Sequence, residues 1–163
     1  MSKKIWPLLR LRAKSEEELK EKYREVYIKE YVNQEIYDWM GNRVIFHRFT
    51  FDHAFSSSSN YRFSYGHHDN SFCEKRARHI LWIKEVLKAS KGTIERRHEV
   101  IKGSRNKIKK RRILCVIEEK YVVVLEEKET NTLEFVTAFL ADKNWYNREF
   151  KKKSLIEIKK GKQ

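Results

Sequence analysis

Six histidines and an excess of lysine and arginine are the residues of this chain that could do chemistry. No two histidines have the HExxH spacing of a zinc protease, and Cys73 and Cys115 alone cannot form a four-thiolate zinc site. The sequence contains no GxxxxGK[ST] or GxGxxG loop for a nucleotide and no GxSxG nucleophile elbow. We therefore expect neither a metal nor a cofactor.

Histidine together with arginine and lysine suits the cleavage of RNA without a metal. A histidine with a pKa near neutrality can remove the proton of the 2′-hydroxyl, which then attacks the phosphorus, and a second acid can protonate the leaving 5′-oxygen. Cationic side chains stabilise the charge that grows on the phosphoryl oxygens. DNA lacks the 2′-hydroxyl, so this chemistry selects RNA and leaves a 2′,3′-cyclic phosphate.

The candidate catalytic residues lie in the middle of the chain and near its end. His53, in FDHAF, follows a predicted strand, and His67 or His68, in a polar loop, could be the second acid or base. Arg76 falls on the apolar stripe of a predicted helix, where it needs an anion, either a carboxylate or a phosphate. Thr137 interrupts the run FVTAF, and its hydroxyl could donate to a phosphate. Each residue also has a purely structural alternative, such as a salt bridge for Arg76.

The positive charge of the chain favours nucleic acid as a partner. The formal net charge is +14, and the excess is concentrated in residues 1–14, 102–112 and 148–163. Such blocks are typical of proteins that bind a polyanion. The expected nucleic-acid contacts are Arg78, Lys107, Lys109, Lys110, Arg111, Arg112 and Lys120.

Two further expectations follow from the composition. No run approaches 18 apolar residues, so we expect no membrane span and no membrane partner. The N-terminal apolar piece is too short and too interrupted by arginine for a signal peptide, which favours a cytoplasmic protein.

The elements that must position these residues alternate between helical and strand-like patterns. Ser15 and Glu18 form a capping box that starts a helix. The patterns predict helices over 16–39 and 72–89, a strand over 43–51, a loop over 52–71, a basic helix or irregular segment over 93–108, and strands over 113–118, 121–126 and 133–141. This order predicts an α+β fold with N-terminal helices packed on a four-stranded antiparallel sheet. The expected organisation is a helical arm at 1–42, a domain at 43–147 and a basic tail at 148–163.

The order of four short motifs resembles a known class of nucleases. FDHAF, RARHILWIKEVL, YVVVLEE and LEFVTAFLAD, within about residues 46–142, are similar to the phage-associated barnase–EndoU–colicin–RelE (BECR) class. The resemblance implies a BECR-like ribonuclease fold and a metal-independent endoribonuclease of the toxin or mobile-element effector type. It places His53, Arg76 and Thr137 at the positions of the family's histidine, helix arginine and final-strand hydroxyl. An acidic antitoxin or immunity protein would be a partner of such a toxin.

Two alternatives to an endoribonuclease stay open at this point. A degenerate member of the same class would keep the fold and bind RNA or DNA without cutting it. A phage or mobile-element factor could instead use the basic blocks to bind an acidic host protein.

Overall fold

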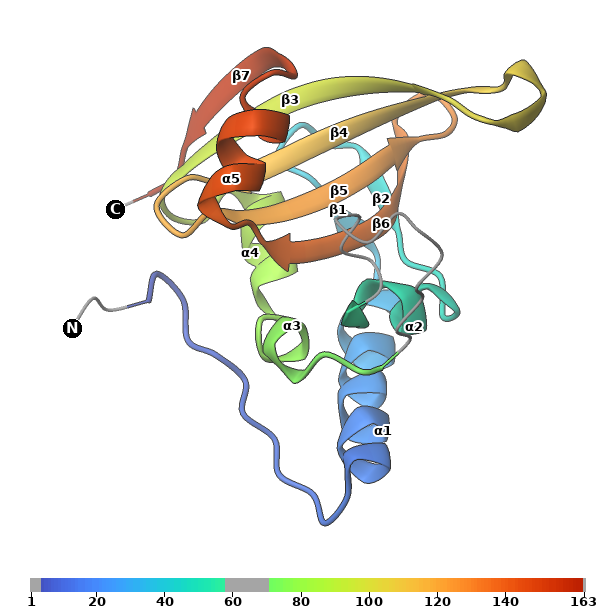
Figure 1. Cartoon of the computed structure of the whole chain (residues 1–163), viewed down its shortest axis with the longest axis vertical. Helices are drawn as coiled ribbons and strands as arrows, with labels where there is room; N and C mark the ends of the chain where they lie inside the picture. The colour runs from blue at the N-terminus through green and yellow to red at the C-terminus, as the bar shows by residue number, and fades with distance from the viewer. Residues whose placement is uncertain (1–3, 58–70, 163) are drawn as a thin grey trace.

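A curled seven-stranded sheet forms the centre of the fold, and Figure 1 shows it above most of the helices. The computed structural model describes residues 4–57 and 71–162. Neighbouring strands are antiparallel except β2 and β6, which run parallel. In spatial order the strands are β1 (Ile36–Tyr37), β2 (Arg43–Ile45), β6 (Thr132–Leu140), β5 (Tyr121–Glu127), β4 (Ile108–Val116), β3 (Thr93–Lys102) and β7 (Ser154–Lys160).

The helical elements are short, and the longest begins at the predicted capping box. The Ser15 side chain accepts a hydrogen bond from the Glu18 backbone N–H at 3.1 Å, which confirms this cap. The elements are α1 (Glu16–Tyr27), a π-helix (Ile28–Val32), α2 (Thr50–Ala54), α3 (Glu74–Arg78), α4 (Trp82–Lys88), a 3₁₀ turn (Ser104–Asn106), α5 (Lys143–Trp145) and a second π-helix (Tyr146–Phe150).

The predicted four-stranded antiparallel sheet is wrong. The segment expected as a basic helix or irregular stretch at 93–108 contains β3, which pairs with β4 over nine residue pairs. The segment expected as a basic tail contains β7, which pairs with β3. Both strands carry charged side chains that stay exposed or form ion pairs, so their hydrophobic pattern is weak. The short strands β1 and β2 extend the sheet at the other edge.

Three other predicted elements are shorter than expected. The helix expected at 16–39 ends at Val32, because Ile36 and Tyr37 pair with β2 instead. The strand expected at 43–51 stops at Ile45, and α2 begins at Thr50. The helix expected at 72–89 is divided into α3 and α4.

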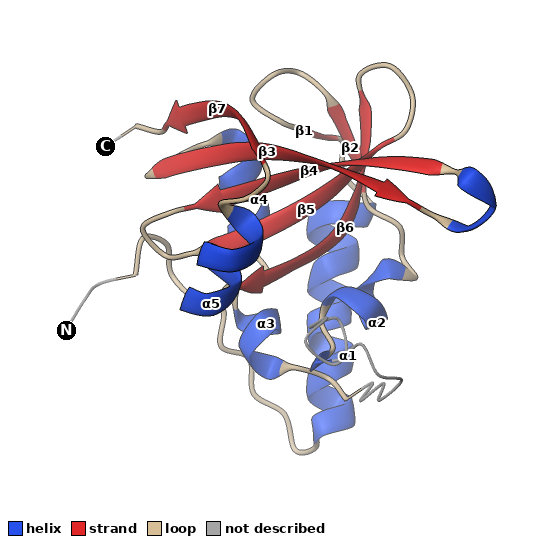
Figure 2. Cartoon of the chain, turned by 45° about the horizontal axis from the view of Figure 1, so that its top comes forward, coloured by secondary structure: helices blue, strands red, loops and turns tan. Residues whose placement is uncertain are grey.

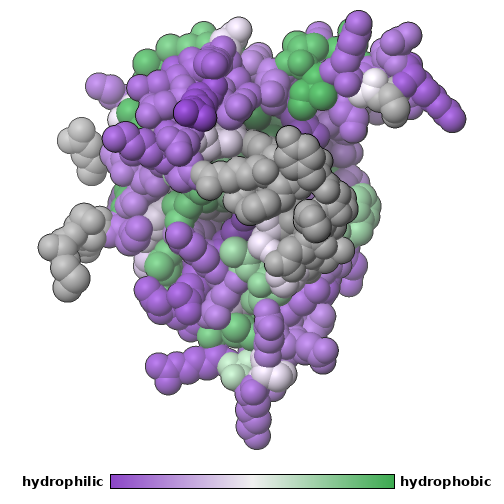
Figure 3. Space-filling view, in the orientation of Figure 1, coloured by the Kyte–Doolittle hydropathy of each residue, from purple (hydrophilic) through white to green (hydrophobic). Residues whose placement is uncertain are grey.

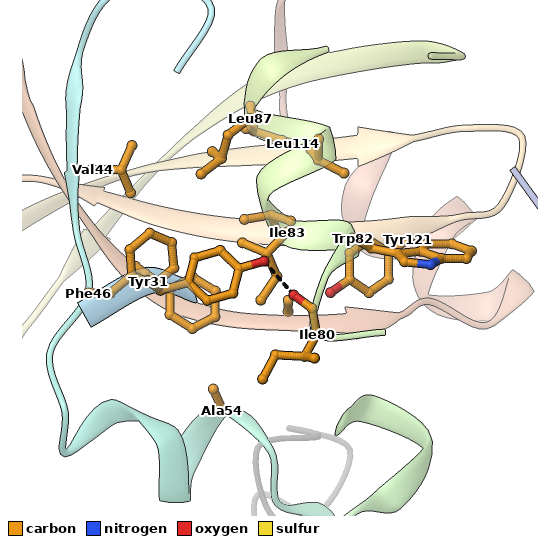
Figure 4. Close-up of a cluster of buried hydrophobic side chains, with 14 of the residues drawn as sticks. Tyr31, Val44, Phe46, Ala54, Ile80, Trp82, Ile83, Leu87, Leu114 and Tyr121 are labelled. Atoms are coloured by element: carbon orange, nitrogen blue, oxygen red, sulfur yellow. Dashed lines mark hydrogen bonds between the residues drawn. The ribbon is translucent and has the colours of Figure 1, made fainter. Parts of the chain in front are cut away.

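The main core fills one face of the sheet, which we call the helical face. Apolar side chains of β4, β5 and β6, such as Leu114, Val123 and Phe135, pack there against α1, α4 and the first π-helix. Tyr31 is 1% exposed, and its hydroxyl donates a hydrogen bond to the Ile80 carbonyl at 2.5 Å (Figure 4). The helices therefore hold this face closed to solvent.

The opposite face is covered only in part. Ile113, Val122 and Phe139 form a smaller core there with aromatic residues of α5 and the second π-helix, such as Trp145 and Phe150. Figure 1 shows α5 lying over this side of β4 and β5. Because strand residues alternate between faces, Arg111 and Glu126 continue the same face beyond the aromatic cover.

Candidate nucleic-acid interface

A two-stranded basic arm projects from the sheet (Figure 2). It comprises residues 100–110, the ends of β3 and β4 with the 3₁₀ turn between them. Five exposed cations lie on it, and the nearest ion pairs of this hairpin are formed outside the arm, by Glu99, Arg111 and Arg112. Within the described part of the chain, these five side chains therefore form no ion pair: Lys102, Arg105, Lys107, Lys109 and Lys110.

One face of the basic arm combines cations with exposed aliphatic groups. Val100 lies opposite Lys110 in the strand register, and Ile108 lies opposite Lys102. Residues directly opposite each other share a face of the ribbon. Val100 and Ile108 are 65% and 61% exposed, so the arm can place methyl groups and ammonium groups against one surface.

Three of the predicted catalytic residues meet at the end of α2. The carbonyl of Ala54 accepts hydrogen bonds from Arg76 Nη1 at 3.3 Å and from Thr137 Oγ1 at 3.5 Å. His53 is the preceding residue, and its side chain is exposed. Thr137 is 5% exposed, so its hydroxyl serves this backbone contact. His67 and His68 lie outside the described residues.

The surroundings of His53 favour its neutral form. Partial burial lowers the pKa of His53, and the positive charges of Arg76 and Arg111 lower it further. The guanidinium of Arg76 also lies 5.4 Å from the centre of the Phe139 ring. The site therefore combines an imidazole of lowered pKa with the positive charges of Arg76 and Arg111.

A row of charged side chains crosses the sheet next to this site, and we call it the charged face. Glu126 pairs with Arg111 at 3.5 Å and with Lys128 at 2.7 Å, and Lys128 also reaches Glu134 at 3.8 Å. His47 Nε2 lies 3.1 Å from Glu134 Oε2. Burial raises the pKa of Glu126, but the hydrogen bond from Lys128 and the nearby cations outweigh it, so the pKa is lowered.

His47, Glu126 and Glu134 were not expected as site residues. Only Glu134 carries a local signal, because it stands between Leu133 and Phe135 in a strand-like run, a pattern typical of a solvent-facing side chain. Their meeting depends on the parallel pairing of β2 with β6, which places Ile45 opposite Glu134. No sequence pattern predicts that long-range pairing.

Two predicted nucleic-acid contacts, Arg78 and Lys120, lie away from the basic arm. Arg78 pairs with Glu74 at 2.6 Å within α3. Lys120 is in the turn between β4 and β5, at the opposite end of β4 from the arm, with its ammonium 5.5 Å from the Tyr146 ring centre. Arg112 pairs with Glu127 at 3.3 Å and lies beside the arm, on the face that carries Ile108 and Lys110. Lys107, Lys109, Lys110, Arg111 and Arg112 therefore all lie on the arm or directly next to it.

Figure 3 shows that hydrophilic residues predominate on the side of the molecule that it displays.

Among residues 4–57 and 71–162, no three histidine, cysteine, aspartate or glutamate side chains gather in a way that could hold a metal ion. No helix in these ranges has the length and apolar character needed to cross a bilayer.

The chain matches no protein-family profile, no curated protein and no solved structure at a significant level. The resemblance to BECR nucleases therefore stays a prediction.

Proposed function

We propose that this protein binds RNA through the basic arm and the adjacent charged face. The observation that carries the proposal is the set of five exposed cations on the arm that form no ion pair in the described part of the chain. Lysine and arginine that neutralise phosphates release condensed counterions, which makes binding favourable and dependent on salt. Val100 and Ile108 on the same ribbon supply apolar contacts for sugars or bases.

Fluorescence anisotropy with a single-stranded RNA at several salt concentrations tests this proposal. Changing Lys102, Lys107 and Lys110 together to serine should reduce the slope of log K against log salt by about 2, since each phosphate contact to a single strand contributes about 0.7. The matched control changes three exposed lysines on other elements, Lys29, Lys88 and Lys91. Equal slopes for both triple variants would contradict the proposal.

A second candidate function is endoribonuclease activity at His53. It is favoured by one observation, the convergence of Arg76 and Thr137 on the carbonyl of Ala54, the residue after His53. In this reaction His53 removes the 2′-hydroxyl proton, the oxygen bonds to phosphorus, and the bond to the 5′-oxygen breaks as that oxygen takes a proton. His67 and His68 stay predictions for the proton donor, and His47 is the described histidine on the charged face.

Incubation of the purified protein with total RNA in EDTA tests this second candidate. Cleavage should produce 2′,3′-cyclic phosphate ends and should fall by at least about a hundredfold in His53→Ala, the usual loss for a general base. His98→Ala is the control. Glu99 lies opposite Arg111 in the strand register, and His98 is on the other face of β3, where its Nε2 lies 3.2 Å from Arg96. Absence of cleavage by the wild-type protein, or cleavage that persists in His53→Ala, would contradict the endoribonuclease activity at His53 and leave RNA binding as the proposed function.

A further inference from the structure

An exposed aromatic ring stands beside the charged face, in the turn between β2 and α2. Phe49 is 76% exposed, which is the largest exposed fraction among the large apolar residues in the described part of the chain. Its ring stacks on the imidazole of His47, with 5.1 Å between ring centres and 10° between ring planes. Because His47 covers only one face of the ring, the other face of Phe49 is open to solvent.

Contacts of His47 hold this turn and its ring in place. The His47 carbonyl accepts hydrogen bonds from the hydroxyl of the buried Tyr27 at 2.7 Å and from the Thr50 N–H at 3.1 Å. The imidazole is held in turn by Glu134, whose Oε2 lies 3.1 Å from Nε2. Phe49 is therefore a preorganised platform, and a ligand that stacks on it loses little affinity to the ordering of the turn.

A cation next to the ring distinguishes Phe49 from other exposed aromatic side chains. Arg48 is exposed and forms no ion pair within the described residues. An open aromatic face together with positive charge for the backbone is the combination by which proteins bind single-stranded nucleic acids. Tyr37 is also exposed, but the Arg43 guanidinium lies over its ring at 5.9 Å and its hydroxyl lies 3.4 Å from Glu35.

The strand register places this turn at the same end of the sheet as the basic arm. Ile45 lies opposite Glu134, Glu134 opposite Glu126, and Glu126 opposite Arg111, the first residue beyond the arm. This row spans about 14 Å, because neighbouring strands lie about 4.8 Å apart. A groove lined by residues of β2, the turn after β5 and the start of β6 follows it. Figures 1 and 2 both show the arm and the turn between β2 and α2 toward the same end of the molecule.

We infer that the open face of Phe49 stacks a base of single-stranded RNA whose phosphates lie along the charged face and the basic arm. Bases inside a duplex stay stacked on each other, so only an unpaired base can use the ring. Every base has a flat aromatic face, so this contact should not select a sequence. The inference rests on the proposed RNA binding and names the form of RNA, single-stranded, that the site takes.

Removal of the ring and removal of the bases should have the same cause and therefore not add. The wild type and Phe49→Ala are titrated with a short single-stranded RNA and with an abasic ribose–phosphate strand of the same length. Phe49→Ala should bind the intact RNA at least about fivefold more weakly, and it should bind the abasic strand within about twofold of the wild type. Phe49→Trp should restore binding, because a larger ring stacks as well. An equal loss with both strands would overturn the inference.

Salt dependence and a duplex separate this inference from the proposed function. Phe49→Ala removes no phosphate contact, so the slope of log K against log salt should stay unchanged, as should the affinity for an RNA duplex. Tyr37→Ala is the control, and it should bind every RNA as the wild type does. Single-stranded RNA that binds Phe49→Ala as tightly as the wild type would overturn the inference and leave binding by the arm intact. If the wild type binds no RNA, the proposed function fails and the inference fails with it.

Discussion

The hydroxyl of Tyr31 is buried between two backbone groups, donating to the Ile80 carbonyl and accepting from the Lys84 N–H at 3.2 Å. Tyr31→Phe leaves both groups unpaired in the core, so the free energy of unfolding should fall by about 1–3 kcal/mol. Urea denaturation monitored by circular dichroism measures this change. Tyr37→Phe is the control, because Tyr37 is 48% exposed and its loss should stay within about 0.5 kcal/mol. An equal fall in the free energy of unfolding for the two variants would contradict the role of the Tyr31 hydroxyl in pairing the two buried backbone groups.

The pKa of His53 tests the electrostatics of the candidate site. Because burial, Arg76 and Arg111 all lower this pKa, an NMR titration should give a value below 6.5. Arg111→Gln keeps much of the side-chain volume and removes one charge, so the pKa should rise toward 6.5. Binding of a phosphodiester should raise it as well, since an anion favours the imidazolium. A pKa above 6.5 in the wild type would contradict the placement of His53 beside these cations.

At the residue scale, sequence patterns predicted the contacts that form between residues close together in the chain. The capping contact from Ser15 to Glu18 depends on four consecutive residues, and it forms as expected. Arg76 on an apolar helix stripe was predicted to meet a carboxylate or a phosphate, whereas its hydrogen bond to the Ala54 carbonyl is to a neutral acceptor. That acceptor comes from an element 22 residues away in sequence, which no local pattern identifies.

At the element scale, the basic arm can be removed without disturbing the core. Glu99 and Arg111 lie opposite each other in the register, so an Asn-Gly turn can replace residues 100–110. Val100 and Ile108 are exposed, so we expect the free energy of unfolding to change by less than about 1 kcal/mol. RNA affinity should fall at least about tenfold. Denaturation and anisotropy measure the two quantities, and RNA affinity that survives the deletion would contradict the role of the arm.

The strands also show which elements of the sheet could be predicted from the sequence and which could not. The runs that form β4, β5 and β6 are apolar and β-branched, and their existence was predicted. β3 pairs with β4 on one side and with β7 on the other, and β7 leaves Leu155 and Ile158 about half exposed. Because tertiary pairing rather than burial makes them strands, their sequences resemble a basic helix or tail.

At the scale of the whole molecule, three histidines make stability depend on pH. Burial is the largest cause that lowers the pKa of His53, His79 and His98. The unfolded chain then binds protons on these groups at a higher pH than the folded protein does. Their contribution to stability is complete above about pH 6.5 and declines as the pH falls through the lowered folded pKa values. The free energy of unfolding should therefore be smaller at pH 5.5 than at pH 7.5 in urea titrations, and equal or larger stability at pH 5.5 would contradict these shifts.

The central claim is that RNA lies on the basic arm and the charged face. Backbone amide chemical-shift mapping during titration with a short single-stranded RNA tests it most directly. We predict that the shifts concentrate in residues 100–112 and around His47, His53 and Glu126, and that α1 and the first π-helix stay unchanged. Shifts confined to those helices, or no shifts at low salt, would contradict the claim.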